Sequence, residues 1–142
     1  MTTATPSPFI PSMSRRRFIP ALGILLLGAR WPGDARVRAR HPHPEPRPGI
    51  TGANVLDTEE VVRSKAADLY DAAREYPRLF DGLYCYCRCE KSMGHRSLLS
   101  CFESDQAIGC LGCREEARIV ARMAREGKSL ADIRAAVDRK WG

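Results

Sequence analysis

The centre of this sequence is a cysteine-rich stretch, Cys85-Tyr86-Cys87-Arg88-Cys89, which is followed by Cys101 and by Cys110-Leu111-Gly112-Cys113. These are the six cysteines of the chain, and all of them lie between residues 85 and 113. Thiols are costly to keep because they oxidise and cross-link. A cluster this dense therefore indicates a soft-metal site or a set of disulfides rather than ordinary packing.

The spacing of the cysteines restricts the backbone around them. In an extended strand, residues i and i+2 lie roughly 6.6–7 Å apart, whereas thiolates on one tetrahedral zinc lie roughly 3.7–3.8 Å apart. Residues 85–89 must therefore curl if their sulfurs are to share a metal. Cys110-x-x-Cys113 is a common two-ligand spacing, and the positive end of a helix beginning there would favour thiolates. The expected metal ligands, in order, are Cys85, Cys87, Cys89, Cys110 and Cys113, then Cys101, and last His95.

Other interpretations of these cysteines stay open. An exported small domain with an even number of cysteines is commonly a disulfide scaffold. Bonds within residues 85–89 would close strained rings, so each of these cysteines would need a partner from residues 101–113. Cys110 and Cys113 could also form a dithiol redox pair. Cys101 could equally be a small buried hydrophobe, and His95 a helix cap or a surface residue.

The N-terminal region has the pattern of an export signal. Ser14-Arg15-Arg16-Arg17-Phe18-Ile19 is followed by an apolar run from Ala21 to Ala29, which is shorter than the roughly 20 residues that span a bilayer. The paired arginines resemble the consensus of twin-arginine signals, with an Arg-rich general secretory signal as the alternative. We expect a signal over residues 1–35, with the cleavage site between 29 and 39.

Export would place the protein in the periplasm or another extracytoplasmic space. An uncleaved signal would instead act as an N-terminal anchor, and no lipid anchor is expected because no cysteine stands at the end of the apolar run, where a lipid would be attached. Resemblance to twin-arginine substrates implies export of a folded protein, often with its cofactor already bound. Metal acquired in the reducing cytosol would protect thiolates from the oxidising compartment.

The rest of the chain divides by composition. Residues 36–54 are rich in proline and poor in apolar side chains, which predicts a solvated, extended linker. Residues 55–142 are expected to form one Cys-rich helical domain, small enough to need a metal or disulfide staple. The formal charge of +6 comes from the N-terminal region, since the predicted domain has as many basic as acidic residues. No nucleic-acid partner is expected, because binding would need a basic face.

Apolar periodicity in the predicted domain indicates helices. The expected elements are a helix from 58 to Pro77, capped by Asp57 or Thr58, a short helix over 96–102, a helix from about 113 to 126, and a helix over 130–141. Gly127 should end the third of these helices, and Ser129 with Asp132 should cap the fourth. We therefore predict an all-α domain of three to four helices, with the CYCRC loop clamped between them.

The sequence resembles the exported bacterial proteins named for a PCYCGC or CYCxC motif. The similarity covers roughly residues 58–141 and consists of the run over 83–89, the run over 94–102, the Cys-x-x-Cys pair and the Gly127-Lys128-Ser129 turn. It implies that the six cysteines and His95 form one constellation, but it implies no particular activity. Tyr84 and Arg88 stand where the motif has proline and glycine. Arg88 makes a positive φ at that position doubtful, although its charge could offset that of thiolates.

Together these patterns predict an exported thiolate protein that binds a soft metal, with Cu(I) favoured and Zn or an Fe–S centre as alternatives. Its role would be metal delivery, buffering or sensing rather than catalysis, with a membrane or exported metalloprotein as a partner. The alternatives are a thiol–disulfide redox protein using Cys110 and Cys113, and a disulfide-stapled module that binds another protein.

Overall fold

A computed structural model describes residues 41–142, and within this range the chain forms helices and turns without a strand. The all-α prediction is therefore confirmed. There are seven α-helical segments and one 3₁₀ turn in this range, rather than three to four helices. They are α1 (Glu59–Arg63), α2 (Ala67–Glu75), α3 (Pro77–Asp81), α4 (Cys89–Met93), η1 (Leu99–Cys101), α5 (Gln106–Gly109), α6 (Leu111–Arg125) and α7 (Leu130–Trp141).

The number of helices exceeds the prediction partly because the first expected helix is divided. Thr58 caps α1 as predicted, with its hydroxyl accepting a hydrogen bond from the Val61 N–H. The Ser64 hydroxyl then donates to the Val61 carbonyl at 2.8 Å and accepts from the Ala66 N–H at 3.1 Å, which interrupts the helical ladder. Pro77 begins a new helix, because its fixed φ suits the first helical position.

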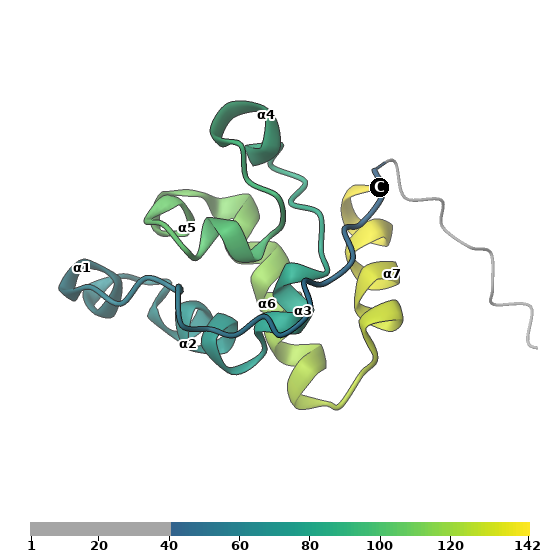
Figure 1. Ribbon diagram of the computed structural model, residues 1–142, viewed down its shortest axis with the longest axis horizontal. Coiled ribbons are helices and arrows are strands. Elements are labelled where there is room, and N and C mark those ends of the chain that lie inside the picture. Colours follow the sequence, from purple (N-terminus) through teal and green to yellow (C-terminus); the bar gives the residue numbers. More distant parts are fainter. Residues whose placement is uncertain (1–40) are drawn as a thin grey trace, which may run out of the picture. The chain divides into compact units, whose positions relative to one another are not determined.

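Helix α6 crosses the middle of the fold and contacts α2, α3, α5 and α7 (Figure 1). Its buried apolar face includes Ala117 and Val120, as predicted, whereas Met123 and Ala124 are only half-buried. Gly127 takes a φ of +69° after the helix, so the predicted glycine stop is confirmed. The predicted capping box at the start of α7 is also present, with Ser129 and Asp132 bonding each other's backbone N–H groups.

Residues 41–54 differ from the solvated linker expected for them. They lie along the helical domain, where Arg47 donates backbone and side-chain hydrogen bonds to the buried Asp81 carboxylate, at 2.7 Å from the backbone nitrogen. Arg134 on α7 donates to the Pro44 carbonyl at 2.7 Å. These long-range charged bonds offset the ordering entropy that favours an extended chain.

The predicted export signal lies outside the described residues. In the part of the chain that the structure describes, no helix is both long enough and apolar enough to cross a membrane.

Candidate metal centre

The cysteine-rich stretch curls into a tight turn, as its spacing predicted. The Arg88 N–H donates to the Cys85 carbonyl at 3.1 Å, and α4 begins at Cys89. Arg88 adopts the left-handed conformation, with φ 62° and ψ 29°, so the doubt about a positive φ at this position was wrong. The conformation costs a non-glycine residue about 1–2 kcal/mol, and the packing of the cysteines on both sides of the turn holds it in place.

Four cysteines converge in the core, and we call them the buried sulfur set: Cys85, Cys89, Cys101 and Cys113. Each comes from a different element, namely the turn, α4, η1 and α6. Their sulfurs all lie within 4.8 Å of one another, with Cys85 Sγ 3.6 Å from Cys113 Sγ and 3.8 Å from Cys101 Sγ. None is more than 4% exposed. Cys101, ranked low as a ligand from the sequence, is thus brought fully into the cluster.

A second group, which we call the outer sulfur set, consists of Cys87, Cys110 and Cys113. Cys87 Sγ and Cys110 Sγ are 3.2 Å apart, and both side chains are only partly buried. Cys110 caps α6, and its sulfur accepts the Cys113 N–H at 3.4 Å, so the predicted Cys-x-x-Cys pair does stand at the mouth of a helix. Cys113 belongs to both sets. All six cysteines are free thiols.

Glu116 is a member of the site that the sequence interpretation missed. It lies one turn after Cys113 on α6 and is 1% exposed. Its Oε1 accepts the Tyr86 N–H at 2.9 Å, whereas its Oε2 is buried with no hydrogen-bond partner. A carboxylate oxygen of Glu116 lies within 4.8 Å of the sulfurs of Cys85 and Cys87. Burial raises the pKa of the Glu116 carboxyl to about 9, and the neighbouring charge of Cys85 adds to this effect.

The thiols of the cluster differ in acidity because they hydrogen-bond one another. Bonds from the Cys101 and Cys113 thiols lower the pKa of Cys85 below its ordinary value. Hydrogen bonds with neighbouring thiols, that of Cys101 first and then those of Cys85 and Cys87, raise the pKa of Cys113. At Cys110 burial opposes ionisation, but the Cys113 N–H and its thiol outweigh it and lower the pKa. Within the buried sulfur set these hydrogen bonds therefore favour ionisation at Cys85 and oppose it at Cys113, and a bound cation would favour the thiolate form of every ligand.

His95 lies beside the cluster rather than within it. Its Nδ1 is 3.3 Å from Cys101 Sγ, but the ring belongs to neither set of converging sulfurs. The Gly94 that precedes it ends α4 with a φ of +71° and so turns the chain toward η1. His95 is thus placed to hydrogen-bond Cys101 and orient its sulfur, as second partners of metal ligands do.

Aromatic side chains cover the turn and join it to residues 41–43. Tyr84 stacks on His41 at a centroid distance of 4.6 Å, and its N–H donates to His43 Nδ1 at 3.0 Å. His43 Nε2 and the Tyr86 hydroxyl both bond Asp138 Oδ1 on α7, at 2.8 and 2.6 Å. Tyrosines of the turn and histidines of the proline-rich segment therefore cover the site together.

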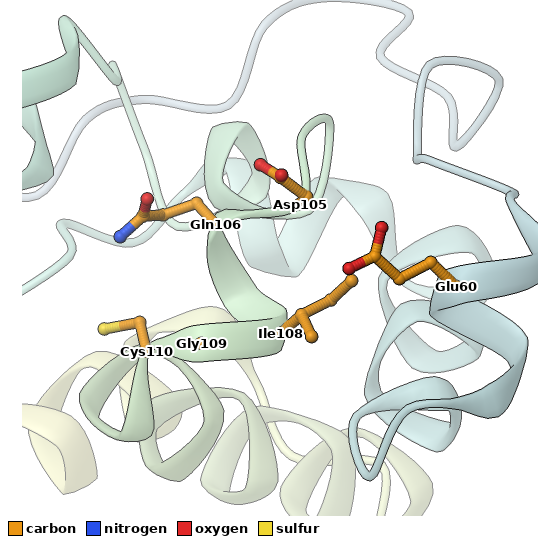
Figure 2. A pocket seen from close by; sticks show the side chains of 6 residues that line it. All are labelled: Glu60, Asp105, Gln106, Ile108, Gly109 and Cys110. Carbon is orange, nitrogen blue, oxygen red and sulfur yellow. The ribbon is translucent and has the colours of Figure 1, made fainter.

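A surface depression adjoins the centre without including it. Its lining consists of Glu60 from α1 together with Asp105, Gln106, Ile108, Gly109 and Cys110 (Figure 2). In Figure 2 the sulfur of Cys110 points away from Ile108 and Glu60. Cys110 is thus the one member of the two sulfur sets that lines this depression.

The fold and the site define a small helical domain built around a cysteine cluster that could hold a metal ion. The chain belongs to the family described as "Protein of unknown function with PCYCGC motif", whose model matches residues 51–142. The Gly of that motif corresponds to Arg88, which has the backbone conformation that glycine adopts most easily. No curated protein and no solved structure matches this chain.

Proposed function

We propose that this protein is an exported thiolate metal-binding protein that handles a soft metal, with Cu(I) favoured and Zn or an Fe–S centre as alternatives. The observation that carries the proposal is the convergence of four unpaired, buried sulfurs within 4.8 Å of one another. Buried thiols gain little from gathering in this way, because each is a small hydrophobe that any alkyl group could replace. Binding one cation, in contrast, requires them to meet at one point.

The spacing of the sulfurs supports a metal. The separations of 3.6 and 3.8 Å from Cys85 to Cys113 and Cys101 are close to the roughly 3.7–3.8 Å between thiolates on a tetrahedral ion. The donor set is rich in sulfur and enclosed by apolar core, and thiolates of this kind select soft metals over hard ones such as Mg²⁺ or Ca²⁺. The shielding by Tyr84 and Tyr86 would slow oxidation of the bound thiolates.

The export part of the proposal rests on sequence. The Arg15-Arg16 pair before the apolar run supports the twin-arginine route, which would carry the folded domain with its metal bound. A protein of this design would deliver, store or sense metal outside the cytoplasm, in exchange with a membrane or exported metalloprotein.

The test is elemental analysis with thiol counting on protein isolated anaerobically from the compartment to which it is exported. We expect a soft metal in the native protein and six reactive thiols after denaturation. A Cys85→Ser, Cys113→Ser double variant should lose the metal. The matched control is Met93→Leu, which removes an exposed soft sulfur outside the cluster and should retain the metal.

A thiol–disulfide redox function is the second candidate. It is favoured by Cys110, whose sulfur caps α6 and whose pKa is lowered by hydrogen bonds that outweigh burial. Protein isolated without metal and with two reactive thiols would replace the metal proposal with this one. Protein without metal and without reactive thiols would point to a disulfide-stapled module.

A further inference from the structure

We infer that the cluster binds two soft metal ions joined by the thiolate of Cys113, one in the buried sulfur set and one in the outer sulfur set. The inference rests on the proposed metal-binding function and adds the number of ions, the bridging ligand and the order in which the ions exchange.

The first step concerns the number of ligands. The buried sulfur set by itself supplies the four sulfurs of a closed tetrahedral site. Cys87 and Cys110 are left over, yet their sulfurs are 3.2 Å apart and both lie within 4.8 Å of Cys113 Sγ. The two sets share only Cys113, and a thiolate sulfur has enough lone pairs to bind two soft ions at once.

The second step concerns Glu116, one of whose carboxylate oxygens accepts the Tyr86 N–H while the other has no hydrogen-bond partner. Its carboxyl group is almost completely buried, its Oε2 has no partner, and it lies beside the sulfurs of Cys87 and Cys85. A buried acid in such a place is costly unless a positive charge or a proton compensates it. An ion in the outer set would put positive charge on the Cys87 side of this carboxyl group.

The third step concerns access. The side chains of the buried sulfur set are at most 4% exposed, whereas Cys87 and Cys110 are only partly buried. An ion in the outer set can therefore meet an incoming ligand directly, but an ion in the buried set cannot. The outer ion should exchange first, and the inner ion should hold the fold together.

The experiment uses ¹¹³Cd²⁺, a soft ion with a nuclear spin, as the probe on the full-length, reduced chain under anaerobic conditions. Native mass spectrometry should find two Cd²⁺ ions per chain, and NMR should find two ¹¹³Cd resonances coupled to each other through the shared sulfur. EDTA should remove one ion at least tenfold faster than the other. A Cys87→Ser, Cys110→Ser double variant should bind one ion, and the Met93→Leu control should bind two.

Each result separates this inference from the proposed function. One ion per chain in the unaltered protein would overturn the two-ion centre and leave the metal-binding function standing. Two ions whose resonances are not coupled would overturn the bridge at Cys113. No bound ion would refute the metal-binding function itself. The unaltered chain decides all three outcomes, so the inference does not depend on the folding of the variant.

Discussion

Replacing Gly112 by alanine should disturb the outer sulfur set directly. A Cβ built at Gly112 lies 2.4 Å from Cys87 Sγ, whereas ordinary contacts begin at 3.4 Å. The sulfur or the first turn of α6 must therefore move by about 1 Å. Either movement changes the position of Cys87 relative to Cys110, whose sulfurs are now 3.2 Å apart.

The magnitude follows from two opposing effects. Overpacking of this kind costs about 1–3 kcal/mol, while alanine gains about 0.5–1 kcal/mol over glycine within a helix. The overpacking wins, and we expect a net loss of about 1–2 kcal/mol. With a urea m-value of about 1–3 kcal/mol/M, the midpoint of unfolding should fall by roughly 0.3–2 M.

The assay is urea denaturation of Gly112→Ala, together with the number of Cd²⁺ ions bound. Gly109→Ala is the matched control, because a Cβ there meets nothing within 4 Å and the residue ends α5 just before Cys110. The control should keep the stability and metal content of the unaltered chain. If Gly112→Ala also keeps both, the close contact with Cys87 does not govern the site.

Four further substitutions probe the two left-handed positions around α4, the buried Asp81 carboxylate and the proline-rich segment. Arg88→Gly should raise the free energy of unfolding by up to about 1 kcal/mol, because glycine adopts this left-handed conformation without strain. Gly94→Ala should lower it by a similar amount. If the urea midpoints of the two variants shift in the same direction, the reasoning is contradicted. Asp81→Ala should cost about 2–3 kcal/mol, because it removes the acceptor of Arg47 and of the other donors whose hydrogen bonds outweigh burial and lower the pKa of Asp81. A loss below about 0.5 kcal/mol, which is the size of a surface effect, would show that solvent replaces these bonds. Burial lowers the pKa of His43 despite its neighbouring carboxylate. The stability that neutral His43 contributes is therefore present above its ordinary pKa of about 6.5 and is lost as pH falls below it. Between pH 7.5 and 5 the melting temperature of His43→Gln should fall less than that of the unaltered chain, and equal falls would exclude a contribution of His43.

Much of the local structure could be predicted because it depends on neighbours in sequence. Thr58 and Ser129 cap helices through bonds that span three residues, and Gly127 stops α6 because of its own backbone freedom. The curl of residues 85–89 followed from the distance that two thiolates can tolerate. The division of the first helix was missed because Ser64 could bond either water or the backbone, and only the folded chain selects the backbone.

Which residues meet in the cysteine cluster depended on long-range contacts that the spacing of residues along the sequence does not reveal. Cys101 was ranked only sixth among the expected ligands, and the placement of η1 in the core is what brings its sulfur within 3.8 Å of Cys85 Sγ. Glu116 could have been noticed as a charged residue on the buried face of α6, one turn after Cys113, but its unpartnered oxygen appears only in three dimensions.

The sequence by itself determined the helical class, the helix caps and the cysteine-rich character of the site, because these depend on local backbone preferences and on residue chemistry. The tertiary structure decided that the cysteines divide into two sets sharing Cys113, and that residues 41–54 lie on the domain through Arg47 and Asp81. Both outcomes depend on which distant groups meet once the core has formed. A sulfur or a carboxylate has many potential partners along the chain, and packing brings only a few of them within bonding distance.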